Sequence, residues 1–286
     1  MPKLILLHPQ ELNIAQTQQV VDQFSGGTHH IISTKAASIE INEDILPETK
    51  KRIQDFCFAL QIDTIFLKDH FQPEDFRVLA FDMDSTLINI ECIDEIARSS
   101  GKWAEVSAIT EASMRGEITD FEESLRKRVE LLKSVSENVL EHVYTQELRF
   151  NPGAQHLIQG AQERGWHTVL VSGGFNFFTK RIQHRLGLDE AYANTLEIVD
   201  GKLTGRVLGA VVDGQAKAGF VQAACAQFGL PASSAITIGD GSNDLPMMSI
   251  SGLSIGFKPK PIVQKNADGC LRNVGLDAIL ELFPIQ

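Results

Sequence analysis

Short apolar runs alternate with amphipathic stretches over most of this chain. Runs at 78–81, 168–171 and 235–239 are apolar at successive positions, which is typical of strands buried on both faces of a parallel sheet. Stretches at 152–164, 175–186 and 215–228 have helical patterns, and 253–256 and 269–271 are further strand candidates. The segment 196–208 reads as a hairpin that turns at Asp200-Gly201. This alternation predicts an α/β fold with a doubly wound parallel sheet.

The first 72 residues have a pattern of their own. Strands are expected at 3–8, 30–33, 37–41 and 64–67, and helices at 13–23 and 47–60. Gly26-Gly27 is expected to interrupt the regular structure between two of these elements. The order βαββαβ is that of a ferredoxin-like unit. The stretch 70–75, which contains Pro73, is the expected linker. We therefore expect two domains, 1–72 and 73–286.

Residues 91–148 interrupt the strand–helix alternation. They contain helix signals and no good strand, and Asp120 with Glu123 forms a capping-box pattern before an apolar helix face. A helical insertion after the first strand of the second domain is expected to form a cap over a site. The alternative is a helical extension that only packs on the core.

Composition and charge narrow the function classes. A net charge of −11 argues against a general nucleic-acid binder. No apolar run approaches the roughly 20 residues of a membrane span. The first eight residues lack the features of a signal peptide, and the four cysteines have no paired metal-ligand spacing. We expect a cytoplasmic protein with reduced thiols that binds neither nucleic acid nor membrane.

Polar residues stand where the apolar runs end. Asp82 and Asp84 follow the run 78–81, Ser172-Gly173-Gly174 follows 168–171, and Asp240 follows 235–239. Ligands of open α/β sheets bind at the carboxyl ends of the strands. Asp82 and Asp84 would repel each other in an apolar site, so a divalent cation or a shared proton is expected to compensate them.

Four motifs in this order carry a resemblance. They are Asp82-Met83-Asp84, Ser172-Gly173-Gly174, Lys217, and the run from Gly239 to Asp244, which reads Gly-Asp-Gly-Ser-Asn-Asp. The set resembles the motifs of the haloacid dehalogenase superfamily of aspartate-nucleophile phosphotransferases. Over residues 77–284 the chain is similar to the phosphoserine phosphatase family within it. The first 72 residues look like the ACT-type domain that precedes many of these enzymes, on element order alone.

The resemblance implies a role for each catalytic residue. Asp82 is the expected nucleophile and a metal ligand, and Asp84 the acid that protonates the leaving oxygen and ligates metal through its backbone carbonyl; ligation by both side chains is the rival assignment. Asp240 is the second metal carboxylate, for Mg²⁺. Asp244 would hold a metal-bound water or orient Lys217. Lys217 supplies a charge for phosphate and carboxylates, a role that residue chemistry alone would also allow for Lys202 or Lys180.

A second set of residues is expected to bind the substrate. Ser172, Gly173 and Gly174 offer a hydroxyl and N–H groups to phosphate at the start of a helix. Phosphoserine also has an ammonium and a carboxylate, for which Glu91 and Arg128 match the family's acid and arginine. Phe121 shares a helix face with Arg128, and Asn243 lies between two acids. The matched spacing also includes Thr110, Met114 and Gly116, whereas Ser242 stands where alanine is usual.

The function that the resemblance implies is hydrolysis of O-phospho-L-serine to L-serine and phosphate, the last step of serine biosynthesis, through an aspartyl phosphate. One alternative is a phosphatase or phosphotransferase for another small phosphate, such as phosphohomoserine. Another is an amino-acid-sensing regulatory protein, which the intact set of Asp82, Asp84, Lys217 and Asp240 disfavours. The partner would be a small phosphoamino acid, and a homodimer paired through strand edges is an open option.

Overall fold

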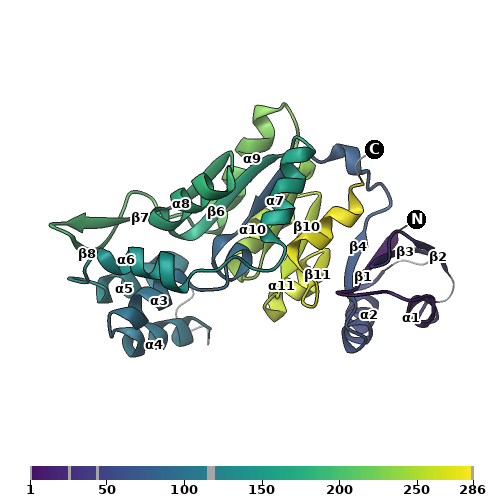
Figure 1. Ribbon diagram of the computed structural model, residues 1–286, viewed down its shortest axis with the longest axis horizontal. Coiled ribbons are helices and arrows are strands. Elements are labelled where there is room, and N and C mark those ends of the chain that lie inside the picture. Colours follow the sequence, from purple (N-terminus) through teal and green to yellow (C-terminus); the bar gives the residue numbers. More distant parts are fainter. Residues whose placement is uncertain (1, 25–26, 43–44, 115–119, 285–286) are drawn as a thin grey trace.

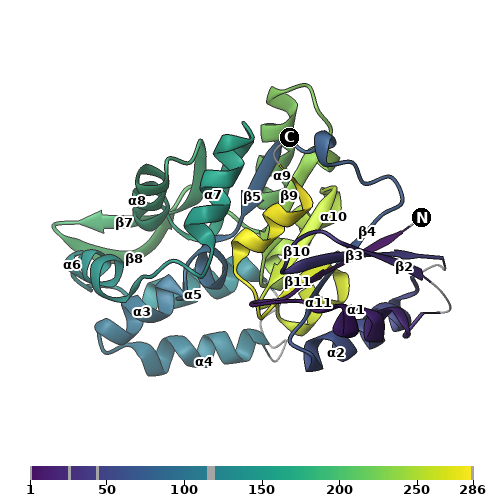
Figure 2. The same ribbon diagram turned by 45° about the vertical axis from the view of Figure 1, so that its right-hand side comes forward.

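Strand β5 (Val78–Phe81) lies between β9 and β6 in the sheet (Figure 2) and is buried on both faces in the computed structural model of the protein. The structure describes residues 2–24, 27–42, 45–114 and 120–284. Val78 and Ala80 pack with residues of α9 (Gly214–Gln227). Leu79 and Phe81 pack with residues of α7 (Ala154–Glu163). Successive side chains of a strand point to opposite faces, so helices cover both faces and the predicted doubly wound architecture is confirmed.

Within the described residues, eleven strands form one sheet in the order β2-β3-β1-β4-β11-β10-β9-β5-β6-β7-β8. The strands from β11 to β7 run parallel to one another, and β8 returns antiparallel to β7. The remaining strands are β1 (Lys3–Leu7), β2 (Gly27–Ile31), β3 (Ala36–Ile41), β4 (Asp63–Leu67), β6 (His167–Phe175), β7 (Glu190–Val199), β8 (Lys202–Leu208), β9 (Ala235–Gly239), β10 (Leu253–Phe257) and β11 (Gly269–Leu271).

The remaining α-helices are distributed over the first unit, the cap and the faces of the sheet. They are α1 (Ile14–Val21), α2 (Pro47–Ala59), α3 (Cys92–Ser99), α4 (Trp103–Met114), α5 (Phe121–Leu131), α6 (Asn138–His142), α8 (Asn176–Leu186), α10 (Leu245–Ile250) and α11 (Pro261–Asn266). No helix among the described residues is long and apolar enough to cross a membrane.

The first unit has the predicted βαββαβ order, and its strand order β2-β3-β1-β4 is ferredoxin-like. The expected strand at 30–33 is misplaced, because β2 starts at Gly27, which pairs with Ile41 of β3. Gly27 is therefore the first residue of a strand and not part of the predicted interruption. The likeness to ACT-type domains stays a prediction.

The two units share one sheet, which the sequence did not predict. β4 pairs antiparallel with β11 through Ile65 opposite Gly269 and Thr64 opposite Cys270. Next to this seam, the buried carboxylate of Asp63 accepts hydrogen bonds from the backbone N–H groups of residues 272–274 at 2.8–2.9 Å. Burial raises the pKa of Asp63, and these bonds oppose the rise. The first unit is thus joined to the second by backbone pairing and a buried acid, and not by the linker alone.

Helices α3 to α6 gather on one side of the molecule, next to the β7–β8 hairpin (Figures 1 and 2). Asp120 caps α5 by accepting from the N–H groups of Glu122 and Glu123, which confirms the predicted start of that helix. Glu123 pairs with Lys127 at 2.6 Å instead of completing the capping box. Asp200 and Gly201, with φ of 51° and 72°, form the predicted hairpin turn.

Candidate active site

The turn after β5 carries Asp82 and Asp84. The N–H of Asp82 donates to the carbonyl of Ile238 on β9, which fixes Asp82 at the end of the strand. Ser85 has φ of 56°, a left-handed conformation that turns the chain sharply after Asp84. The N–H of Cys92, at the start of α3, donates to Oδ1 of Asp84 at 2.8 Å. The beginning of the cap therefore holds the second aspartate in place.

Lys217 is completely buried beneath the site. Its Nζ lies 2.7 Å from Oδ1 of Asp82 and 2.7 Å from Oδ1 of Asp244. Burial alone would lower the pKa of Lys217, but Asp244 and Asp82 more than offset this and raise it. α9 can approach this closely because a Cβ on Gly214 would lie 2.8 Å from the carbonyl oxygen of Asn243. Among the three lysines that the chemistry allowed, Lys217 is the one in contact with the aspartates.

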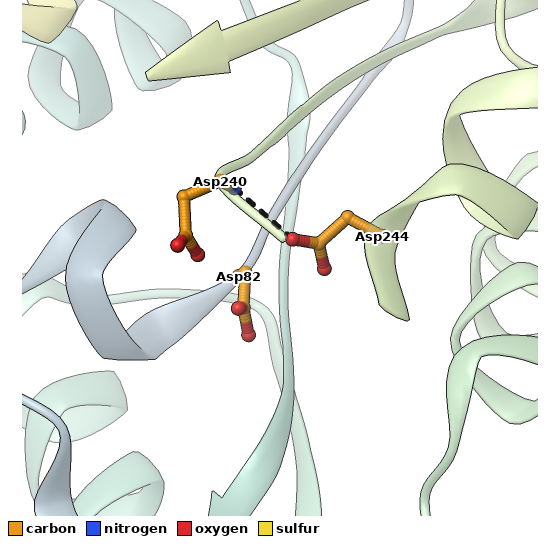
Figure 3. A group of neighbouring side chains, drawn as sticks. All are labelled: Asp82, Asp240 and Asp244. Carbon is orange, nitrogen blue, oxygen red and sulfur yellow. Dashed lines mark hydrogen bonds between the residues drawn. The ribbon is translucent and has the colours of Figure 1, made fainter. Parts of the chain in front are cut away.

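Asp240 and Asp244 come from the turn after β9. One oxygen of each of Asp82, Asp240 and Asp244 lies within 4.8 Å of the others (Figure 3). Oδ2 of Asp244 accepts from the N–H groups of Asp240 at 3.1 Å and Gly241 at 3.0 Å, while its Oδ1 meets Lys217. The carboxylate of Asp244 is therefore bound by protein donors, as expected of a residue that orients its neighbours.

The donor set fits a hard divalent cation. Buried carboxylate oxygens of Asp82 and Asp240 converge, and oxygen donors of this kind suit Mg²⁺. Burial raises the pKa of Asp240 to about 6 although Lys260 opposes the rise, and burial with the charge of Asp244 raises the pKa of Asp82. Both groups would be stabilised in their ionised form by a bound cation.

The Ser-Gly-Gly segment differs from its predicted setting. β6 continues through it to Phe175, with a register shift against β7 between Val171 and Phe175, and α8 begins only at Asn176. Gly173 and Gly174 thus lie in an irregular strand and not at a helix start. The hydroxyl of Ser172 accepts from the N–H of Gly174 at 2.9 Å and donates to Oδ2 of Asp84 at 3.4 Å.

Both glycines are required by close contacts. A Cβ on Gly174 would lie 2.5 Å from Oδ2 of Asp84, and one on Gly173 would lie 2.7 Å from Cζ of Phe121. Phe121 is the first residue of α5, so the tip of a cap helix rests directly on the strand that ends at the site. The cap expected from the sequence is therefore in contact with the site through Phe121.

A cavity of about 80 Å³ lies between the cap and the ends of the strands. Eight of the predicted site residues line it, namely Asp82, Asp84, Glu91, Arg128, Gly173, Gly174, Asp240 and Asn243. Phe121, Ser172, Lys217 and Asp244 are not part of this lining, but the contacts described above connect each of them to a residue that is.

The acid and the arginine of the cap meet at this cavity. Oε1 of Glu91 accepts a hydrogen bond from the hydroxyl of Ser85 at 2.7 Å. The Nε of Arg128 donates to the carbonyl of Ser124, one turn earlier on α5. Burial lowers the pKa of Arg128, while Asp94, Glu91 and Asp84 oppose the shift. Both side chains thus line the cavity from the cap.

Burial and the neighbouring Glu91 raise the pKa of Asp84 to about 7. Oδ2 of Asp84 faces the hydroxyl of Ser172 at the cavity wall. A carboxyl group with a pKa near the working pH can both donate and accept a proton in a reaction. This is the property that the predicted acid requires.

Two residues that the sequence did not reveal also shape the site. Asn194 is buried, donates to the carbonyl of Gly173 at 2.8 Å and accepts from the N–H of Val212 at 2.8 Å. Lys260 lines the cavity and pairs with Asp240. Lys260 follows the strand next to β9, and the rule that parallel strand ends share an edge could have drawn attention to it.

Part of the matched spacing lies outside the described residues. Nothing is described for Gly116 or for the side chain of Met114. Thr110 lies on α4, where its hydroxyl donates to the carbonyl of Val106.

Comparison with known proteins agrees with this geometry. The haloacid dehalogenase-like hydrolases match residues 79–249. A phosphoserine phosphatase from Polaromonas sp. is 52% identical over 212 residues, which are 73% of this chain and 90% of that protein. A haloacid dehalogenase family hydrolase from Salmonella enterica has a TM-score of 0.86 at 27% identity, with both chains covered completely.

A further solved structure bears on the chemistry. It is a phospho-aspartyl intermediate analogue of a phosphoserine phosphatase, 40% identical, with a TM-score of 0.68 over 73% of this chain and 99% of that one. The matches include the segment that carries Asp82 and Asp240. On this evidence the chain belongs to the phosphoserine phosphatase family of haloacid dehalogenase-like hydrolases.

Proposed function

We propose that this protein hydrolyses O-phospho-L-serine to L-serine and phosphate, with Mg²⁺ as its cofactor. The observation that carries the proposal is the shared cavity, which Asp82 and Asp84 line together with Glu91 and Arg128. The first pair suits phosphoryl transfer, and the second pair suits the ammonium and carboxylate of an amino acid. The proposal is supported by the family membership and by the phosphoserine phosphatases to which the chain is similar.

In the first step, a carboxylate oxygen of Asp82 forms a bond to phosphorus while the bond from phosphorus to the serine oxygen breaks. Asp84 gives its proton to that oxygen, so L-serine leaves with a neutral hydroxyl. Ser172 and the neighbouring glycines would hold the phosphoryl oxygens, for which the hydrogen bond between the Gly174 N–H and the Ser172 hydroxyl has to open. Lys217 keeps Asp82 oriented from beneath.

In the second step, Asp84, now ionised, takes a proton from water, and the water oxygen attacks the phosphorus of the aspartyl phosphate. Phosphate leaves, and Asp82 and the proton of Asp84 are restored. The carboxylates of Asp82 and Asp240, with the backbone carbonyl of Asp84, would hold Mg²⁺, which neutralises phosphate charge when bound.

The test is a phosphate-release screen on phosphoserine, phosphohomoserine and p-nitrophenyl phosphate, with and without Mg²⁺. We expect the highest kcat/KM for phosphoserine and no turnover after removal of the metal. A preference for phosphohomoserine would select the alternative substrate.

The nucleophile can be tested separately. Asp82→Asn should abolish turnover and leave the fold intact, because an amide neither attacks phosphorus nor ligates Mg²⁺ well. In the unmutated protein, beryllium fluoride should load Asp82. A phosphoryl adduct mapped by mass spectrometry to Ser172 would refute the mechanism.

A further inference from the structure

The backbone aims Lys260 at the cavity. β10 ends at Phe257, and a Cβ on Gly256 would lie 2.8 Å from Cβ of Pro259, so the glycine lets the chain fold back on itself. Lys260 stands between Pro259 and Pro261 with φ of −62° and ψ of 155°, the extended conformation that a following proline favours. Its placement is thus fixed by rigid neighbours.

Lys260 contacts Asp240 through both its backbone and its side chain. Its backbone N–H donates to the carbonyl of Asp240 at 2.9 Å, and its Nζ lies 3.3 Å from Oδ2 of Asp240. The first contact anchors the backbone of Asp240, and the second places the ammonium beside one oxygen of its carboxylate.

The other cations near the site have other carboxylate neighbours. Lys217 is shared between Asp82 and Asp244. Arg128 approaches from the cap, where the charges of Asp94, Glu91 and Asp84 act on it. Among these three cations, Lys260 is the one that contacts the carboxylate of Asp240.

We propose that Lys260 is a positioning residue, which orients the carboxylate of Asp240 for the divalent cation. The inference rests on the metal site of the proposed function. Partners that hydrogen-bond a metal-ligating carboxylate orient it, and their loss typically costs about 10- to 100-fold in metal affinity or activity. A simple charge argument has the opposite sign, because a nearby ammonium repels a cation. The direction in which Mg²⁺ affinity changes when Lys260 is replaced therefore distinguishes orientation of Asp240 from repulsion of the cation.

The experiment measures Mg²⁺ binding by calorimetry on the metal-free, full-length protein without substrate. The variants are Lys260→Met, Lys260→Arg, Asp240→Asn and Lys258→Met. Lys258 is the matched control, since it lies two residues away on the same loop and places its ammonium over the ring of Phe257. Melting temperatures show whether each variant is folded.

We expect Lys260→Met to weaken Mg²⁺ binding about 10- to 100-fold, Lys260→Arg to recover most of it, and Lys258→Met to leave it unchanged. Equal or tighter binding by folded Lys260→Met would overturn the proposal, as would a change confined to the KM for phosphoserine. If the unmutated protein does not bind Mg²⁺, or Asp240→Asn binds it equally well, the metal site itself fails.

Discussion

Asp84 is held by the N–H of Cys92 and faces Ser172. In the proposed reaction this one carboxyl group acts in both steps, first as acid and then as base. Asp84→Asn should therefore lose most activity on phosphoserine while still allowing Mg²⁺ to bind. The loss should be smaller for an aryl phosphate, whose leaving group needs less protonation. Measured kcat values for the two substrates test this. An equal loss on both would show that Asp84 does not protonate the leaving oxygen.

The raised pKa of Asp84 also predicts a pH effect on stability. Burial moves this pKa from 3.8 to about 7, so between these values the folded chain holds a proton that the unfolded chain releases. The contribution to stability is complete below pH 3.8 and is lost as the pH rises through 7. An amide does not titrate. The melting temperature of metal-free Asp84→Asn should therefore exceed that of the unmutated protein by more at pH 8 than at pH 4.5; a pH-independent difference would contradict the raised pKa.

The cap residues Arg128 and Glu91 should control specificity. Arg128→Ala and Glu91→Gln should raise KM for phosphoserine far more than for p-nitrophenyl phosphate, which has no ammonium or carboxylate. A lost charge-assisted hydrogen bond is worth roughly 1.5–3 kcal/mol, or about 10- to 150-fold in affinity. Steady-state kinetics on both substrates measure the effect. Similar changes for the two would make both side chains structural.

Most of the cavity lining could be predicted, because Asp82, Asp84 and Asp240 follow apolar strands and the family spacing marks Glu91 and Arg128. Asp82 and Asp240 follow apolar runs whose parallel arrangement brings their ends together. Asn194 could not be predicted, because a lone asparagine is an ordinary residue in sequence, and for Lys260 the only signal is its place after a strand that neighbours β9. Their roles arise from contacts across 21 and 20 positions with Gly173 and Asp240.

At the scale of elements, Phe121 of α5 contacts β6 at Gly173. A Cβ on Gly173 would lie 2.7 Å from Phe121, so Gly173→Ala should push the cap helix outward and lower kcat/KM for phosphoserine. Phe121→Leu removes the far end of the ring. In the double variant the two losses should be less than additive, with a coupling of about 0.5–3 kcal/mol. Strictly additive losses would show that this contact does not seat the cap.

The same strand shows why element boundaries were harder to predict than elements. Ser172-Gly173-Gly174 contains turn residues, which favour a strand end at Val171 and a helix soon after it. In the folded chain, Phe175 still pairs with Asn194 of β7. This tertiary pairing carries the strand through the glycines, and no local pattern records it.

At the scale of the whole molecule, the cavity lies entirely in the second unit. Deletion of residues 1–72 should leave a foldable, Mg²⁺-dependent phosphatase. The Polaromonas relative, matched over 90% of its length by 73% of this chain, supports this expectation. The melting temperature should fall, because the N–H groups that bind Asp63 lose their acceptor. Circular dichroism and phosphate release measure both effects; a folded but inactive truncation would mean that the first unit helps to build the site.

The β4–β11 pairing bears on how such a truncation is to be interpreted. In the intact chain β11 is an interior strand, flanked by β10 and β4. Cutting the chain before residue 73 makes it an edge, with peptide groups open to any other strand. A larger particle seen by light scattering after truncation would thus come from an edge that the cut itself creates. Only a decrease in the number of chains per particle would report the loss of a native contact between copies. Through β4, the first unit therefore covers the edge of β11 that would otherwise be open to other strands.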